Sequence, residues 1–221
     1  MTREMGPFVD RQSAGLALAK ALAKHPLQRP ALVLGLPRGG VPVAYEVAQA
    51  LHLPLDVMVV RKVGLPGQPE LAVGAIASGN ITVRDADDLF GLGERFERIA
   101  ERERGELARR ERAYRGDAPP LDLHGTSVIL VDDGLATGST MLAAVRAARQ
   151  AGAASVIVAV PVGSPEAVTL LRREADEVII LSMPPMLRAI GEWYEDFHQL
   201  EDADVCRLLE RAARTAKSKA H

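Results

Sequence analysis

The sequence has little cysteine and few aromatic residues, and it has no long apolar run. The single cysteine, Cys206, excludes a framework of disulfides within the chain and is typical of a reducing compartment. No apolar run approaches the length of a membrane span. The formal net charge of −2 gives no general attraction to nucleic acid or to an anionic membrane. We therefore expect a cytoplasmic protein whose partners are neither nucleic acid nor membrane.

What is present is typical of a globular chain, with 48% hydrophobic and 25% charged residues among 221. Short apolar segments alternate with stretches of helical periodicity, which predicts a three-layer α/β fold around a mainly parallel sheet. The expected strands are 31–36, 55–60, 128–131, 155–160 and 177–181, and the expected helices between them are 42–51, 141–150 and 164–173. A hairpin is expected at 72–84.

The most informative segment runs from Val128 to Thr140. Its first four residues are apolar without alternation, which predicts a strand covered on both faces. Asp132 and Asp133 follow where that strand ends. Small residues then lead into a helix, whose first amides and positive dipole end can hold a phosphate. Because the acid pair would repel that phosphate, the pair must face sugar hydroxyls or a magnesium ion.

A plain strand-to-helix turn with an aspartate cap is the alternative. It accounts for one acid and leaves the second acid and the Thr-Gly-Ser-Thr run unexplained. The segment instead resembles the phosphoribosyl-pyrophosphate (PRPP) signature of type I phosphoribosyltransferases: four hydrophobic residues, two acids and a Thr-Gly-x-Thr phosphate loop. One departure is Gly134, where that signature usually carries a branched or small polar residue.

The resemblance implies a role for each residue of the segment. Asp132 and Asp133 would hold the ribose hydroxyls and, through water, Mg²⁺. The 5′-phosphate would be bound by Ala136, Thr137, Gly138, Ser139 and Thr140. Hypoxanthine-type enzymes carry an aspartate at the place of Ala136 that can serve as base, so a general base must come from elsewhere in this chain.

A second glycine-containing loop follows the first expected strand, with the sequence Gly35-Leu36-Pro37-Arg38-Gly39-Gly40. Adjacent glycines let the backbone approach an anion, and Arg38 adds a charged donor. Taken alone, the loop is as well explained by a tight turn. Beside the signature it resembles the pyrophosphate loop of the same family, and the resemblance implies that Arg38, Gly39 and Gly40 bind pyrophosphate.

Residues 61–71 are rich in glycine and proline and predict a loop. Lys62 is the only lysine between positions 24 and 217. The loop resembles the mobile catalytic loop of phosphoribosyltransferases, which implies that Lys62 takes part in catalysis and helps to bind pyrophosphate. Adenine-type enzymes of the family take a glutamate from this loop instead of the missing aspartate. This resemblance implies that Glu70 would handle the proton of the attacking nitrogen. A solvated basic pair, Arg61 and Lys62, and an exposed loop glutamate are the alternatives.

The remaining expectations concern domain organisation. We expect an α/β core over residues 1–182, including a charged helix at about 94–114, then a small hood and a C-terminal helix over 183–214, and a disordered tail at 215–221. In the family a hood covers the base, so Trp193 and Tyr194 are candidates for stacking on it, although aromatic residues more often pack in a core. Cys206 lies in an apolar helical stripe and is expected in the core.

The sequence thus predicts a type I phosphoribosyltransferase-like protein that uses PRPP, Mg²⁺ and a nitrogenous acceptor. A non-catalytic PRPP- or nucleotide-sensing regulator on the same fold is the alternative, because a fold and a ligand site do not guarantee turnover. A receiver-like magnesium-phosphate protein is disfavoured, since it would lack the phosphate loop. A homodimer is left open.

Overall fold

The computed structural model describes residues 7–65, 68–84 and 93–219. Its centre is a parallel sheet in the order β2-β1-β6-β7-β8. These strands are β1 (Ala31–Gly35), β2 (Leu55–Val57), β6 (Ser127–Val131), β7 (Ser155–Val162) and β8 (Glu177–Ser182). The predicted parallel α/β sheet is therefore confirmed, and the signature strand lies at its middle.

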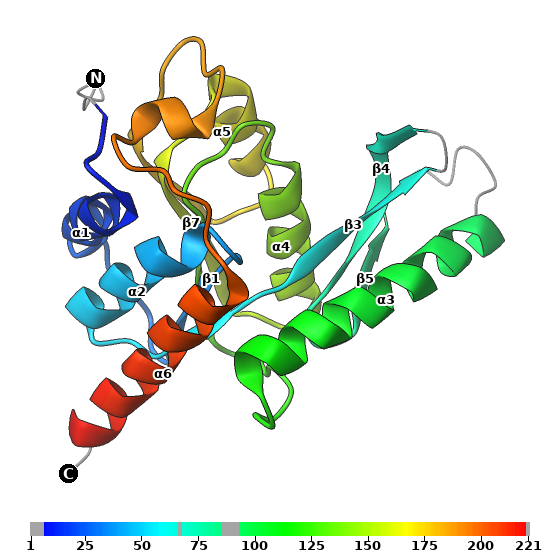
Figure 1. Cartoon of the computed structure of the whole chain (residues 1–221), viewed down its shortest axis with the longest axis horizontal. Coiled ribbons are helices and arrows are strands. Elements are labelled where there is room, and N and C mark those ends of the chain that lie inside the picture. Colours follow the sequence, from blue (N-terminus) through cyan, green and yellow to red (C-terminus); the bar gives the residue numbers. More distant parts are fainter. Residues whose placement is uncertain (1–6, 66–67, 85–92, 220–221) are drawn as a thin grey trace.

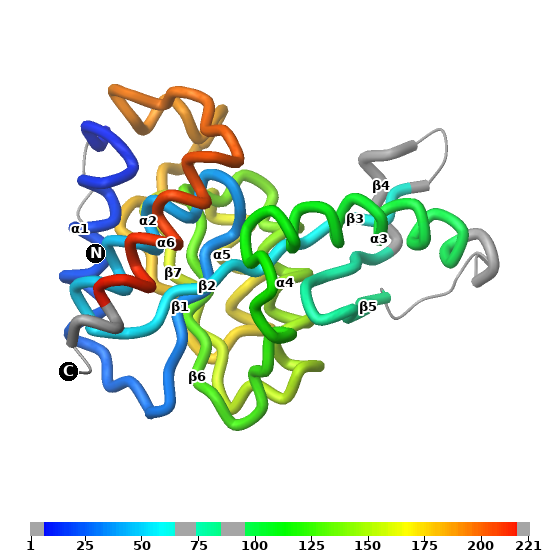
Figure 2. Tube along the Cα trace, turned by 60° about the horizontal axis from the view of Figure 1, so that its bottom comes forward, coloured from blue at the N-terminus to red at the C-terminus, as the bar shows by residue number. Residues whose placement is uncertain are grey.

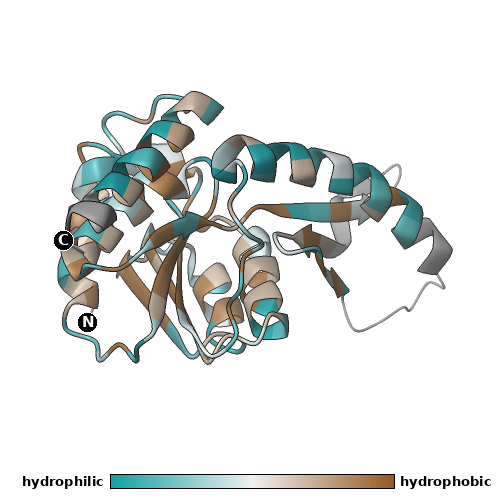
Figure 3. Cartoon of the chain, turned by 90° about the horizontal axis from the view of Figure 1, so that it is seen from below, coloured by the Kyte–Doolittle hydropathy of each residue, from teal (hydrophilic) through white to brown (hydrophobic). Residues whose placement is uncertain are grey.

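Helices cover both faces of this sheet, which gives the three expected layers (Figure 1). The helices α1 (Arg11–Leu22) and α2 (Gly40–Leu51) pack on one face, against Val33, Ile129 and Ile157. The helices α4 (Ser139–Gln150) and α5 (Pro165–Leu171) pack on the other face. The central strands are hydrophobic along most of their length in Figure 3, as strands buried on both faces must be.

Local sequence accounts for where the helices begin. Asp10 caps α1, because its side chain accepts the Ser13 amide at 2.6 Å while the Ser13 hydroxyl lies 3.0 Å from the Asp10 amide. Ser164 caps α5 in the same way, with Pro165 at the first helical position. By contrast, α4 begins after Gly138, which has no side chain to cap it, and a long bond of 3.4 Å joins the Ser139 amide to the Thr137 hydroxyl.

A second sheet, in the order β3-β4-β5, was only partly predicted. The strands β3 (Val60–Leu65), β4 (Gln68–Ala77) and β5 (Ile81–Arg84) are antiparallel. The expected hairpin at 72–84 is confirmed. The expected loop at 61–71 is wrong, because most of it pairs as β3 and β4, and the expected strand 55–60 divides between the two sheets. Figures 1 and 2 show this sheet projecting from the body of the molecule as an arm.

The charged helix α3 (Gly93–Arg115) runs along this arm. Its buried side chains form a narrow stripe in one cluster with Val63 and Ile76 of the arm: Phe96, Ala100, Leu107 and Tyr114. Its charged groups pair with each other, as in Arg110–Glu106 at 2.8 Å. The helix therefore covers the arm. It also reaches the body, where Tyr114 donates to Asp202 of the last helix and Arg115 pairs with Asp56 of β2.

The C-terminal segment returns to the body through a 3₁₀ turn, η1 (Ile190–Trp193), and ends in α6 (Asp202–Lys219). The last helix extends beyond the expected end near Arg214, so a disordered tail starting at 215 is wrong as far as Lys219. Cys206 is half-buried between α6 and α3 rather than in the core, with its thiol 3.1 Å from the Ala113 carbonyl oxygen. Within 7–65, 68–84 and 93–219, no helix is long and apolar enough to cross a membrane.

Candidate active site

The two loops singled out in the sequence meet at one point of the sheet. The neighbouring strands β1 and β6 end together, since Gly35 pairs with Val131. From β1 the chain continues through α2 to β2, and from β6 it continues through α4 to β7 on the opposite side. In open parallel sheets such a switch in direction leaves a crevice at the carboxyl ends of the strands, where ligands bind.

Both glycines of the first loop are needed because this loop packs against the acid pair. A Cβ atom on Gly39 would lie 2.0 Å from Asp133 Oδ2, and one on Gly40 would lie 2.5 Å from the Val131 carbonyl oxygen. The Gly40 amide already donates to the Leu36 carbonyl at 3.0 Å. The structure therefore supports a role for Gly40 through its small size and not through its amide.

Arg38 extends from the same loop toward α6. Its guanidinium Nη1 lies 3.8 Å from Asp202 Oδ1, and 40% of its side chain is exposed. The peptide bond between Pro37 and Arg38 is cis. Arg38 is thus at the crevice and accessible, and its ion pair with Asp202 is a long one.

The acid pair is half-buried and carries more negative charge than its neighbours neutralise. Burial, together with the adjacent Asp133 carboxylate, raises the pKa of Asp132 well above its ordinary value. Burial also raises the pKa of Asp133, against the opposing effect of Arg11, whose Nε donates to Asp133 Oδ2 at 2.8 Å. A cation or sugar hydroxyls at this place would offset the cost of ionising both acids.

The acid pair also bears on how Mg²⁺ could bind. Among the described residues, no group of three or more His, Cys, Asp or Glu side chains could hold a metal ion. The acid pair could supply carboxylate oxygens, and Mg²⁺ is commonly held by one or two carboxylates together with water and substrate oxygens. The residues fit that mode of binding.

Two residues that fix Asp133 were missed by sequence reasoning in this role. Arg11 lies 122 positions from Asp133, in the first turn of α1, and its side chain is 10% exposed. Tyr194 lies 61 positions away, and its hydroxyl donates to the Asp133 backbone carbonyl at 2.6 Å. No local pattern could reveal either contact, because both depend on how the two ends of the chain fold back onto β6.

This placement changes the prediction for the aromatic pair. Tyr194 is 5% exposed and lies between Phe8 and Phe197, with ring centroids 5.8 and 5.1 Å away. Burial raises the pKa of its hydroxyl. Tyr194 is therefore a structural residue that supports the acid turn, residues 132–134, and its ring is not available for stacking on a base. Trp193 is half-buried in the same cluster, and its stacking role stays a prediction.

The departure at Gly134 has a structural explanation. A Cβ atom on Gly134 would lie 2.6 Å from Ile190 Cδ1 and 2.7 Å from Ile190 Cγ2. Ile190 begins η1 and so occupies the space that a larger residue at 134 would take. The segment expected to form the hood is thus packed directly on the acid turn.

The phosphate loop stands at the start of α4, beside the acid pair. Gly138 has φ of +75°, which favours glycine, and the Thr137 and Ser139 hydroxyl oxygens lie 3.1 Å apart. The Ser164 hydroxyl donates to the Ala136 carbonyl at 2.8 Å and ties the loop to the end of β7. Within the described part of the chain, only the Ser139 amide at this helix start has a side-chain acceptor, a long bond of 3.4 Å to the Thr137 hydroxyl, and the amides at the start of α4 are suited to an anionic ligand.

Lys62 lies at this loop, although it was expected in a mobile catalytic loop and as a ligand of the pyrophosphate. It belongs to β3, and its Nζ donates to the Ser139 hydroxyl at 3.2 Å. Arg61, on the other side of the strand, pairs instead with Glu103 of α3 at 2.6 Å. Glu70 belongs to β4 rather than to a loop, and its side chain lies outside the described part of the structure.

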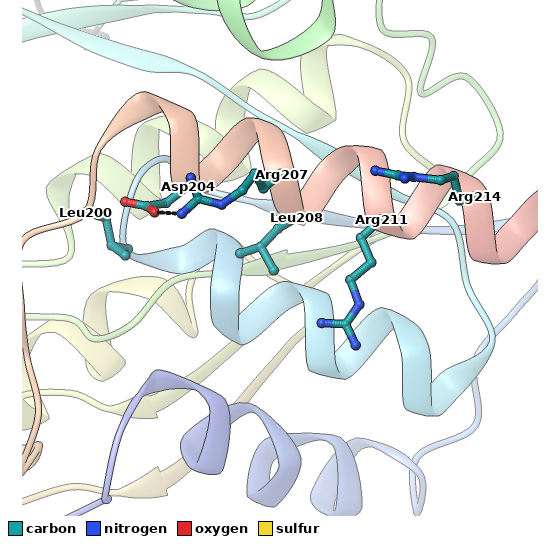
Figure 4. Close-up of a pocket in the computed structure, with 6 residues that line it drawn as sticks. All are labelled: Leu200, Asp204, Arg207, Leu208, Arg211 and Arg214. Carbon is teal, nitrogen blue, oxygen red and sulfur yellow. Dashed lines mark hydrogen bonds and ion pairs between the residues drawn. The ribbon is translucent and has the colours of Figure 1, made fainter.

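A separate pocket lies along α6 and has different chemistry (Figure 4). It is lined by Leu200, Asp204, Arg207, Leu208, Arg211 and Arg214. Arg207 is paired with Asp204, and Arg214 lies 3.4 Å from Glu210. Because these arginines face nearby acids of the same helix and no predicted site residue lines the pocket, we place the site at the strand ends instead.

A parallel α/β sheet with an acid pair and a phosphate loop at its switch point defines the class of type I phosphoribosyltransferases. The chain belongs to the phosphoribosyl transferase family: the model of the phosphoribosyl transferase domain matches residues 9–184.

The chain is also similar to two other proteins. The Mycobacterium tuberculosis protein named "Putative phosphoribosyl transferase Rv0571c" is 43% identical over 210 residues, which are 94% of this chain and 47% of that protein. The chain thus spans about half the length of the curated relatives it matches. The crystal structure of TT1426 from Thermus thermophilus is 46% identical, with a TM-score of 0.84 over 93% of this chain and 98% of that one.

Proposed function

We propose that the protein transfers ribose 5-phosphate from PRPP to a nitrogen nucleophile, a nucleobase or related amine, and releases pyrophosphate. The observation that carries this proposal is the position of the acid pair between two loops suited to anions. A ligand with a phosphate on one side, hydroxyls in the middle and a pyrophosphate on the other side matches that order of groups. PRPP has this arrangement.

Each residue then has a task. Asp132 and Asp133 accept hydrogen bonds from the ribose hydroxyls. Thr137, Ser139 and the start of α4 bind the 5′-phosphate, and the contact with Ser139 favours Lys62 as a further ligand of this phosphate rather than of the pyrophosphate. Arg38, Gly39 and Gly40 remain the candidates for the pyrophosphate.

The substitution at C1 builds positive charge on the ribose as the bond to pyrophosphate breaks. The half-buried carboxylates lie where that charge develops and stabilise it. Mg²⁺, when bound, would neutralise the leaving pyrophosphate and would be held by Asp132 and Asp133 through water. Arg38 adds a positive charge on the leaving-group side. Glu70 stays a candidate for the proton of the nucleophile, on the resemblance alone.

Calorimetry with PRPP, with and without Mg²⁺, tests the binding site. A pyrophosphate-release assay with purines, pyrimidines and small amines tests the transfer. We expect tight binding only with Mg²⁺ and release with at least one acceptor. Tight PRPP binding without release for any acceptor would instead support a PRPP-sensing regulator on this fold, and no PRPP binding would refute both.

A further inference from the structure

Arg11 contacts the acid turn from outside the family's signature. Its Nε donates to Asp133 Oδ2 at 2.8 Å, and its Nη1 donates to the His198 backbone carbonyl at 3.0 Å. Its guanidinium carbon lies 3.9 Å from the centroid of the Phe197 ring. A planar guanidinium donates in fixed directions, so these two bonds together determine its orientation.

The protein holds Arg11 in place from both ends of the chain. The Phe8 amide donates to the Trp193 carbonyl at 2.8 Å, and the Glu195 amide donates to the Phe8 carbonyl at 2.8 Å. The Asp196 amide donates to the Val9 carbonyl at 2.9 Å. Residues 8–11 and 193–198 therefore form one clasp around the acid turn, and Arg11 is the member of it that reaches a carboxylate of the pair.

The same clasp, together with Ile190, fixes the backbone of the acid turn. Tyr194 donates to the Asp133 carbonyl, while Ile190 fills the space beside Gly134. The Asp133 side chain could still rotate on this fixed backbone, and the bond from Arg11 holds it. Arg11 also cancels one negative charge, which leaves the pair suited to accept hydrogen bonds from neutral hydroxyls.

We propose that Arg11 is a positioning residue for the sugar-binding acid pair, and that it determines how strongly the site distinguishes a ribose from a sugar lacking one hydroxyl. The inference rests on the proposed function. Arg11 itself does not touch the sugar in this account. It holds the Asp133 carboxylate in the direction from which a ribose hydroxyl can donate to it.

The test is calorimetry on the full chain with ribose 5-phosphate, 2-deoxyribose 5-phosphate and inorganic phosphate. The wild type should prefer ribose 5-phosphate. Arg11→Met should lose about tenfold or more of that preference, the scale of one hydrogen bond to a charged group, while its affinity for inorganic phosphate stays within about twofold. Arg11→Lys keeps the positive charge but lacks the planar guanidinium with its two fixed donor directions. It should give an intermediate preference for ribose 5-phosphate.

Arg115→Met is the matched control. Arg115 forms a similarly buried ion pair with Asp56, at 3.0 Å, and its side chain is also 10% exposed. That variant should keep the wild-type preference even if it is less stable. It therefore separates loss of a buried ion pair from loss of Asp133 positioning.

Three outcomes contradict the inference in different ways. If Arg11→Met keeps the preference, or loses inorganic phosphate as strongly as ribose 5-phosphate, then Arg11 is structural. If Arg11→Met does not fold, a wild-type preference in Arg11→Lys overturns the proposal. If the wild type itself does not distinguish the two sugars, the assignment of the acid pair to ribose fails, and the proposed function fails with it.

Discussion

At the scale of single residues, Asp133 is the proposed partner of a ribose hydroxyl and is also paired with Arg11. Asp133→Asn should weaken PRPP binding by about 1.5–3 kcal/mol, because a hydrogen bond to a charged group is lost. Its effect on stability should be small, because the loss of the Arg11 partner and the relief of a buried carboxylate whose pKa is raised oppose each other. Calorimetry with Mg²⁺ and chemical denaturation measure the two effects. Asp56→Asn, which disrupts the Arg115 pair, should reduce stability alone, and equal PRPP affinity in Asp133→Asn and wild type would refute the assignment.

Gly134 offers a prediction independent of any ligand. Gly134→Val restores the kind of residue that the family signature usually carries, but its side chain would collide with Ile190. We expect a loss of about 1–3 kcal/mol of folding stability. The double variant Gly134→Val with Ile190→Ala should recover a substantial part of it, because the space is then available. Additive losses in denaturant unfolding would show that the two side chains do not compete.

At the scale of elements, the contact between β3 and the phosphate loop joins the arm to the site. Lys62→Ala should lower the affinity for ribose 5-phosphate and for inorganic phosphate by a similar factor, about tenfold, because one charged ligand of the phosphate is lost. Pyrophosphate affinity should change little. If Lys62→Ala instead weakens pyrophosphate binding and leaves phosphate binding unchanged, Lys62 is a ligand of the pyrophosphate, as the sequence predicted. Thr137→Ala tests the same phosphate-binding loop. A substitution at Gly138 would not test it cleanly, because the φ of +75° strains any residue other than glycine.

The elements differ in how far their sequences predicted them. The strand β6, the acid pair and the start of α4 are fixed by neighbouring residues, and apolar runs, adjacent acids and small residues identify them. The strands β3 and β4 could not be predicted from neighbouring residues, because this segment contains residues typical of a loop: Gly64, Pro66, Gly67 and Pro69. Pairing with each other and packing against α3 overrides that local preference.

At the scale of the whole molecule, the contacts that complete the site come from distant parts of the chain. The α/β class and the position of the crevice follow from the alternation of strands and helices. The contacts of Arg11 and Tyr194 with Asp133 do not, since an arginine in a first helix and an aromatic residue late in the chain have many ordinary uses. Only the closing of residues 8–11 onto 193–198 turns these side chains toward Asp133.

The acid pair should also cost the whole fold stability when no ligand is bound. Because the pKa of Asp132 is raised in the folded state, the folded protein binds that proton more tightly than the unfolded chain does. Stability is therefore lost as pH rises from the ordinary aspartate range through the raised pKa. Asp132→Asn removes this loss while keeping an oxygen that can accept the Asp133 amide. The variant should be more stable than the wild type at neutral pH, and the gain should vanish below about pH 4, where both states of the wild type are protonated at Asp132.

Thermal unfolding across this pH range, without ligand and then with PRPP and Mg²⁺, checks the expectation. Ligand should reverse the order, because a bound ligand at about a hundred times its Kd stabilises the wild type by about 2.7 kcal/mol and the weakened variant by less. Asp176→Asn is the control, since the pKa of Asp176 is lowered and its loss should destabilise the protein at neutral pH. If Asp132→Asn is instead less stable than the wild type at neutral pH, the Asp132 carboxylate stabilises the ligand-free fold. The expectation that its charge is unfavourable until a ligand binds is then wrong.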